Sequence, residues 1–313
     1  MNSANHRDGD GIDRRGFLKC MAWAGTGALY TMSGGILRSQ TLGAAGSGGA
    51  ASGEFSFVQI SDSHIGFKRD PNHDVTATLQ AAVDRIHALP SRPDFILHTG
   101  DLTQMSKPEE FDTLEQVLKS VKAPIFYVPG EHDFNDDGAA YHDRHGKGTK
   151  GDGWYSFDHK GVHFVGLVNV AKAGPGGLGL LGHEQLEWLE DDVANLSDSA
   201  PVVIFAHIPL WTVYPSWGWG TEDSAQALAY LKRFGSLTVL NGHIHQILQK
   251  VEGNVTFHTA MSTAFPQPKP GKAPSPGPMK DVAADKLREM LGLSSMTFVQ
   301  GRNSLAIIDA TLE

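Results

Sequence analysis

The stretch Phe55-Ser56-Phe57-Val58-Gln59-Ile60-Ser61-Asp62-Ser63-His64 decides the fold. Its first six residues, rich in aromatic and β-branched side chains, predict a buried strand, and a polar loop follows directly. Similar short runs recur at residues 55–60, 95–98, 125–128, 163–168, 202–206 and 237–240. Helical patterns lie between them, and this alternation indicates an α/β layered fold.

The helical patterns predict four amphipathic helices, at about residues 74–89, after 106–109, at 184–195 and at 223–234. The second has a capping-box-like start, Ser106-Lys107-Pro108-Glu109, with proline in the first turn. Strand-like runs return at residues 247–260 and 305–312. The proline-rich stretch 266–278 excludes a regular helix or central strand, and loops of that length are usually functional or disordered.

The charge and cysteine content narrow the classes of function. The chain has 313 residues and a formal net charge of −9; its first 45 residues carry five basic and three acidic side chains, so the remainder has −11. A surface this negative binds nucleic acid or anionic membranes poorly, so we expect no nucleic-acid partner. Cys20 is the single cysteine, which excludes disulfides within one chain and zinc sites of the cysteine type.

The amino-terminal stretch Asp13-Arg14-Arg15-Gly16-Phe17-Leu18-Lys19 resembles a twin-arginine export signal. A glycine-diluted apolar run at 20–37 and a small-residue run at 42–51 follow, and we place cleavage after Ala45. We therefore expect a signal peptide at 1–45, a flexible linker at 46–53 and one domain at 54–313. The resemblance implies folded export by the twin-arginine machinery to the periplasm or outside, with no stable membrane span after processing. The alternative is a chance arginine pair before an anchor helix.

Five polar motifs follow the ends of predicted strands: Asp62-Ser63-His64, Gly100-Asp101, Gly130-Glu131-His132-Asp133, His207 and Gly242-His243-Ile244-His245. The carboxyl ends of strands in an open α/β sheet converge on one edge, so residues far apart in sequence can share a site. The available donors are imidazoles and carboxylates, which suit Mn, Fe and Zn.

The order D-x-H, G-D, G-x-H-D, H, G-H-x-H resembles the calcineurin-like metallophosphoesterase superfamily over nearly all of residues 55–260. The resemblance implies a four-layer α/β/β/α sandwich of two mixed sheets flanked by helices. It also implies hydrolysis of a small phosphate mono- or diester with two divalent or mixed-valence metal ions, Mn, Fe or Zn. Two ions about 3.5–4 Å apart neutralise phosphate oxygens, activate water and align its attack.

The resemblance also assigns roles to the motif residues. Asp101 would bridge the two metals. The first metal would be completed by Asp62, His64 and His245, and the second by Glu131, His207 and His243. His132 would donate a proton to the leaving alkoxide, oriented by Asp133 or by a backbone group; a positioned acid contributes about 10²–10⁴-fold.

Two positions depart from related patterns. The family usually carries Asn where this chain has Glu131, whose anionic carboxylate could favour a trivalent ion but blunt the Lewis acidity of the metal. Gln104 stands where purple acid phosphatases place a metal-binding tyrosine, which argues against an iron–tyrosinate centre.

Several alternatives stay open at the level of sequence. The chain could be a cyclic-nucleotide or phospholipid phosphodiesterase, or a non-catalytic metal- or phosphate-binding protein quenched by Glu131. The proline-rich stretch could be a lid or a disordered excursion. Four aromatic residues could either form a wall that stacks a base or sugar or pack a long loop: Trp211, Tyr214, Trp217 and Trp219. We expect His98 to be packed and hydrogen-bonded in the core, and His142 and His145 to lie in a solvated loop.

Overall fold

The computed structural model describes residues 27–33, 36–42, 54–301 and 305–313. The chain divides into two units, 1–50 and 51–313. In the first, the described residues form an antiparallel hairpin of β1 (Gly27–Ser33) and β2 (Ile36–Leu42). The predicted twin-arginine motif and the cleavage site after Ala45 lie outside the described residues. Across the described ranges, no helix is both long and apolar enough to cross a membrane.

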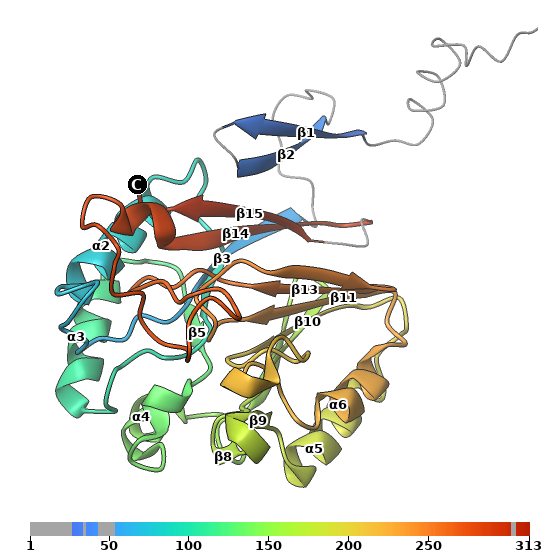
Figure 1. Ribbon diagram of the computed structural model, residues 1–313. Coiled ribbons are helices and arrows are strands. Elements are labelled where there is room, and N and C mark those ends of the chain that lie inside the picture. Colours follow the sequence, from blue (N-terminus) through green and yellow to red (C-terminus); the bar gives the residue numbers. More distant parts are fainter. Residues whose placement is uncertain (1–26, 34–35, 43–53, 302–304) are drawn as a thin grey trace, which may run out of the picture. The chain divides into compact units, whose positions relative to one another are not determined.

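The second unit contains two mixed sheets (Figure 1). The five-stranded sheet has the order β15-β14-β3-β4-β5. Its parallel strands are β3 (Glu54–Ile60), β4 (Phe95–His98) and β5 (Ile125–Tyr127). The antiparallel strands β14 (Gly292–Val299) and β15 (Ala306–Thr311) extend it beyond β3.

The six-stranded sheet has the order β12-β13-β11-β10-β7-β6. Its four central strands run parallel: β13 (Val255–Thr259), β11 (Ser236–Asn241), β10 (Pro201–Ala206) and β7 (Val162–Gly166). The edges are the antiparallel strands β12 (Gln249–Glu252) and β6 (Tyr155–His159). A small separate ribbon pairs β8 (Lys172–Ala173) with β9 (Gly179–Leu180).

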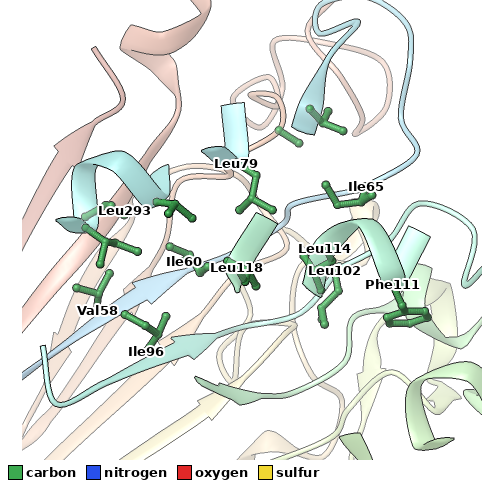
Figure 2. Packing of buried hydrophobic residues seen from close by; sticks show 14 of the residues in the cluster. Val58, Ile60, Ile65, Leu79, Ile96, Leu102, Phe111, Leu114, Leu118 and Leu293 are labelled. Atoms are coloured by element: carbon green, nitrogen blue, oxygen red, sulfur yellow. The ribbon is translucent and has the colours of Figure 1, made fainter. Parts of the chain in front are cut away.

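Helices cover the outer face of each sheet. The buried face of α2 (Val75–His87) and α3 (Pro108–Leu118) packs on β3 and β4, and Figure 2 shows Leu79, Leu114 and Leu118 beside Val58 and Ile60. On the other sheet, α5 (His183–Val193) and α6 (Ser224–Leu231) pack on β7, β10 and β11. The short helix α4 (Ala139–His145) follows β5 and a 3₁₀ turn at Glu131–Phe134.

Between the two sheets lies a core rich in phenylalanine. Phe57 and Phe95 stack with ring centroids 4.9 Å apart, and both meet Phe164 of the opposite sheet edge-on. Alternate residues of β3 thus point to this inner core and to the helices, as the strand period requires. The predicted four-layer sandwich of two mixed sheets is confirmed.

The predicted capping box at the start of α3 is wrong. Lys107 is the N-cap residue and makes no side-chain cap bond. The Ser106 hydroxyl is used elsewhere, because it donates to the His132 carbonyl at 2.9 Å and accepts the Asn135 N–H at 3.1 Å. Ser106 therefore fixes the 3₁₀ turn that carries Glu131 and His132.

Candidate metal centre

All seven predicted metal ligands lie on loops that directly follow strands. Asp62 and His64 follow β3, Asp101 follows β4, and Glu131 opens the turn after β5. From the other sheet, His207 follows β10, while His243 and His245 follow β11. A hydrogen bond joins the ligand loops of the two sheets, because the His243 N–H donates to Asp62 Oδ1 at 3.0 Å. The structure therefore brings together residues up to 183 positions apart, from Asp62 to His245.

The ligand loops adopt a strained backbone conformation. Positive φ angles between 42° and 70° occur at five of the ligands: Asp62, His64, Asp101, His243 and His245. Such left-handed non-glycine residues cost about 1–3 kcal/mol each and cluster at functional sites. The loops also need glycine, because a Cβ at Gly242 would collide with the Ser61 hydroxyl and the Asp62 carboxylate.

One group of three donors is formed by Asp62, His64 and His245. Asp62 Oδ1 lies 3.2 Å from His245 Nε2, and His64 Nε2 lies 3.3 Å from His245 Nε2. Three such donor atoms within 4.8 Å of one another form a group that could hold a metal ion. All three side chains are buried.

A second group is formed by Glu131, His207 and His243. Glu131 Oε2 lies 2.9 Å from His207 Nε2, and Glu131 Oε1 lies 3.0 Å from His243 Nδ1. The two imidazole nitrogens are 3.3 Å apart. Glu131 Oε2 is buried without a hydrogen-bond partner among the described residues, although the side chain as a whole is 41% exposed. Its oxygen therefore points inward to the donor cluster.

Asp101 lies between the two groups. Its Oδ2 atom is 3.4 Å from His64 Nε2 in the first group and 3.4 Å from His207 Nε2 in the second. Its Oδ1 atom accepts the His132 backbone N–H at 3.0 Å. One carboxylate oxygen thus lies at the same distance from an imidazole of each group, a position that suits a bridging ligand.

Hydrogen bonds behind the site orient two of the imidazoles. His207 Nδ1 donates to the Thr99 carbonyl at 2.7 Å, and His245 Nδ1 donates to the Phe265 carbonyl at 2.5 Å. A ring nitrogen bonded to a carbonyl carries the proton, so the lone pair of each Nε2 faces the cluster. This arrangement suits metal coordination, and the donor set fits two divalent metal ions.

The electrostatics favour the metal-binding forms of Asp62, Glu131 and His64. Burial would raise the pKa of Asp62, but the surrounding imidazoles, led by His245, outweigh burial and lower it. Burial would likewise raise the pKa of Glu131, yet His243 and His207 hold it well below its usual range. Burial lowers the pKa of His64 to about 3, despite the opposing effect of Asp101. These carboxylates are therefore ionised and His64 is neutral. Burial would lower the pKa of His207, but the carboxylates of Asp101 and Glu131 outweigh burial and raise it well above its usual value, so a metal ion would displace a proton there.

His132 lies beside the cluster and lines the cavity in front of it. Its Nδ1 donates to the Gln104 carbonyl at 2.9 Å, and its ring centroid is 4.9 Å from that of His64. Burial would lower the pKa of His132, but the carboxylates of Asp101 and Glu131 outweigh burial and raise it. With Nδ1 fixed by a carbonyl, Nε2 is the ring atom available for proton transfer.

Asp133 does not orient His132. Of the two expected orienting groups, the backbone one is found, because the Gln104 carbonyl holds the His132 ring. Asp133 Oδ2 accepts the N–H groups of Leu102 and Gly130, and its Oδ1 accepts the N–H of Thr103, all at 2.8–2.9 Å. Burial and the charge of Asp101 raise its pKa to about 7, whereas these backbone bonds lower it. Asp133 therefore ties the loop of Asp101 to the turn of Glu131.

A cavity of about 300 Å³ opens onto the donor cluster. One wall contains Trp217 and Trp219, whose ring centroids are 5.1 Å apart. The other two aromatic candidates do not line the cavity: Trp211 packs on Phe257 at 5.0 Å, and Tyr214 packs edge-on against Trp217. Only two of the four aromatic residues therefore line the cavity.

The proline-rich stretch forms another wall, with Pro276 and Pro278 lining the cavity. Gln267 ties this stretch to the ligand loops: its Nε2 donates to the His243 carbonyl at 2.8 Å, and its Oε1 accepts the Gly277 N–H at 2.9 Å. The segment is thus packed against the site, as the lid alternative requires.

Two lining residues were not predicted from the sequence, and the structure shows the surroundings of two other histidines. No sequence pattern indicated that Arg69 and Gln267 line the cavity, because each lies in an irregular loop. His98 is buried and 2.8 Å from the Ser63 hydroxyl, which confirms its structural role. His145 belongs to α4 rather than a solvated loop, and its ring stacks on Tyr127 at 4.3 Å.

The chain is similar in sequence to known phosphoesterases. The model of the calcineurin-like phosphoesterase family matches residues 55–247. A glycerophosphodiester phosphodiesterase of Enterobacter lignolyticus is 26% identical, over 67% of this chain and 78% of that protein. A 3',5'-cyclic-nucleotide phosphodiesterase of a Nostoc species is 27% identical, over 67% of this chain and 79% of that protein.

Among solved structures, a dimetal phosphatase from Danio rerio aligns with a TM-score of 0.59. The alignment covers 82% of this chain and 98% of that structure at 15% sequence identity, so it supports the fold alone.

Proposed function

Because the chain belongs to the calcineurin-like phosphoesterase family, we propose that it hydrolyses phosphate esters, diesters in preference to monoesters, at a binuclear metal centre. Its ligands are Asp62, His64, Asp101, Glu131, His207, His243 and His245. The observation that carries the proposal is the position of Asp101 Oδ2, 3.4 Å from an imidazole nitrogen of each donor group. The ions, when bound, supply Lewis acidity toward the phosphate oxygens.

The residues around the centre have separate tasks. Asp101 holds the two groups in register, and Asp133 fixes the loop of Asp101 against the turn of Glu131. His132 delivers a proton from Nε2 to the leaving alkoxide, while the Gln104 carbonyl keeps its ring in place.

The charge of the ligand set supports a preference for diesters. Asp62, Asp101 and Glu131 contribute three negative charges, one more than in a site with Asn in place of Glu131. The extra charge repels a doubly charged monoester more strongly than a singly charged diester. The names of the two relatives, both phosphodiesterases, point in the same direction.

The extra negative charge of Glu131 also affects which metal ions the site prefers. We propose Mn, Fe or Zn, since imidazole and carboxylate donors suit all three. Glu131 stands only in the second group, so a trivalent ion such as Fe³⁺ would gain most there. Trp217 lines the same cavity as the metal ligands, and we expect its ring to contact the substrate.

A combined metal and activity measurement tests the proposal. The purified protein should contain about two metal ions per chain by elemental analysis. With Mn it should hydrolyse bis(4-nitrophenyl) phosphate with a higher kcat/KM than 4-nitrophenyl phosphate. His132→Ala should keep the metal content and lower kcat about 10²–10⁴-fold. His142→Ala, which alters a histidine outside the cavity lining, is the matched control.

Two results would count against the proposal. Protein that holds two metal ions but hydrolyses no ester of the panel would favour the non-catalytic metal-binding alternative. A monoester preference would reject the argument from the charge of Glu131 while leaving the phosphoesterase assignment intact.

We also propose export by the twin-arginine route to the periplasm or outside. Its support is the motif at Arg14-Arg15 with the apolar and small-residue runs behind it. In a host with that machinery, the full chain should be recovered outside the cytoplasm, shortened by about 45 residues. Arg14→Lys combined with Arg15→Lys should block this, and unimpeded export of that variant would reject the route.

A further inference from the structure

Arg69 lies on the wall of the cavity, apart from the metal ligands. Its side chain is exposed to solvent, and its guanidinium carbon stands 5.2 Å from the centroid of the Phe67 ring. Among the described residues that line the cavity, Arg69 alone carries a permanent positive charge. A fixed cation on the wall of a substrate cavity offers a binding point for an anionic group.

The backbone that carries Arg69 is held in place. The Asn72 N–H donates to the Arg69 carbonyl at 2.9 Å, which closes a tight loop. The Asn72 side chain is buried and donates to the Ala264 carbonyl at 2.7 Å and to the Thr78 hydroxyl at 3.0 Å. This anchor joins the loop to the segment beside Phe265, so the backbone from which the Arg69 side chain extends is held in place.

A stack of aromatic rings separates Arg69 from the metal ligands. Phe67 packs on Phe265 with centroids 4.4 Å apart, and Phe265 packs on His64 at 4.7 Å. Two rings thus lie between the guanidinium and the ligand His64 along this line of contacts. The guanidinium is placed to meet a group of the substrate remote from the phosphorus that is attacked.

The charge of Arg69 is not taken up by its acidic neighbour. Asp70, the next residue, pairs with His73 at 2.9 Å. A guanidinium over an aromatic ring can still donate hydrogen bonds from its N–H groups to oxygen ligands. A carboxylate or phosphate could therefore bind it through two parallel hydrogen bonds.

We propose that Arg69 is a specificity-determining residue that binds a second oxyanion of the substrate, a carboxylate or a further phosphate, remote from the scissile phosphate. This inference rests on the proposed phosphodiesterase activity. It defines the preferred substrates as phosphodiesters in which one esterified group bears an additional negative charge. The metal centre binds the phosphodiester, and Arg69 selects among diesters by the group at the far end.

Matched esters with one leaving group test this. The probes are 4-nitrophenyl phenyl phosphate and its 3-carboxyphenyl and 4-carboxyphenyl counterparts, all releasing 4-nitrophenolate when water attacks phosphorus. For at least one carboxylated ester, Arg69→Met should lower kcat/KM about 5- to 20-fold, mostly through KM, since a charged hydrogen bond is lost at a partly solvated site. The uncharged ester should change less than about twofold.

Lys68→Met is the matched control, because Lys68 is the adjacent exposed cation but does not line the cavity. Lys68→Met should leave the ratio of kcat/KM for carboxylated over uncharged esters as it is in the unaltered protein. Arg69→Lys should retain part of the preference for carboxylated esters. Raising the ionic strength should reduce the ratio in the unaltered protein. Since each variant is compared on paired substrates, differences in intrinsic reactivity and in the amount of folded protein cancel.

The outcomes separate the two proposals. Failure of the unaltered protein to hydrolyse any of the three esters would reject the phosphodiesterase activity itself. Hydrolysis of all three with ratios that Arg69→Met leaves unchanged, or that Lys68→Met changes equally, would overturn the role of Arg69 alone.

Discussion

Replacing Glu131 with glutamine should weaken the selectivity of the second donor group for a trivalent ion. The substitution keeps the length of the side chain and an oxygen donor, but it removes one negative charge from a site where Oε2 is 2.9 Å from His207 Nε2. A ligand that contributes charge as well as an oxygen should distinguish a trivalent from a divalent ion. An amide oxygen should do so much less.

The size of the effect follows from Coulomb's law. A third unit of charge on a metal ion about 2.1 Å from the carboxylate oxygen adds roughly 8 kcal/mol of attraction at an effective dielectric constant of 20, and roughly 2 kcal/mol in bulk water. The Glu131 side chain is 41% exposed, so solvent screens the pair and favours the lower part of this range. We expect about 2–4 kcal/mol, or roughly 30- to 1,000-fold in relative affinity.

Gallium(III) and zinc(II) provide a redox-inert pair for the assay. Both ions would be buffered by nitrilotriacetate at fixed free concentrations, and bound metal would be measured by elemental analysis after gel filtration. Glu131→Gln should shift the bound ratio toward zinc, whereas Glu109→Gln, at an exposed carboxylate in the first turn of α3, should not. An unchanged ratio and unchanged total metal in Glu131→Gln would remove this residue from the ligand set.

Three further predictions concern stability and the support of the site. Asp133→Asn should lower the stability of the domain by about 2–4 kcal/mol and reduce bound metal, because an amide N–H₂ would face a backbone donor; thermal melts and elemental analysis measure both. Leu79→Ala, in the fully buried cluster of Figure 2, should cost about 2–5 kcal/mol in urea unfolding without changing metal content. His163 lies 2.9 Å from Asp192, and although burial opposes it, that carboxylate and Asp158 raise the His163 pKa above 6.5. The stabilising effect of the ion pair is complete below pH 6.5 and is lost as pH rises through the raised pKa of His163. The difference in Tm between the unaltered protein and His163→Gln should therefore be larger at pH 6 than at pH 9. An equal difference at the two pH values would reject the ion pair.

The sequence predicted the central strands and the ligand loops because both are encoded locally. β3 places Phe55 and Phe57 in one core and Val58 and Ile60 in another, so it is rich in aromatic and β-branched residues, and its ligands follow within four residues of its end. The edge strand β6 contains Ser156, Asp158 and His159, and β14 contains two serines and a threonine, so neither produced an apolar pattern. Their pairing depends on partners distant in sequence.

The residues of the cavity walls also depend on contacts between segments distant in sequence. Arg69 reaches its position through the hydrogen bond from Asn72 to the Ala264 carbonyl, across 192 residues. Gln267 reaches the ligand loop through the His243 carbonyl, 24 residues away. No local periodicity encodes either contact. The chemistry of the centre could therefore be predicted from motifs, whereas the residues that would select a substrate required the folded chain.

The distribution of charge around the cavity links the metal ligands to substrate choice. Glu131 adds negative charge at the centre, where it disfavours a phosphate group with two charges. Arg69 adds positive charge two stacked rings away, where it favours a charge that is not on that phosphate. A dianion concentrated on one phosphorus therefore meets repulsion from Glu131 and lacks the help of Arg69. The same two charges spread over a diester and a remote oxyanion meet weaker repulsion from Glu131 and are attracted by Arg69. The two charged residues therefore act on the same property of the substrate, the distribution of its negative charge.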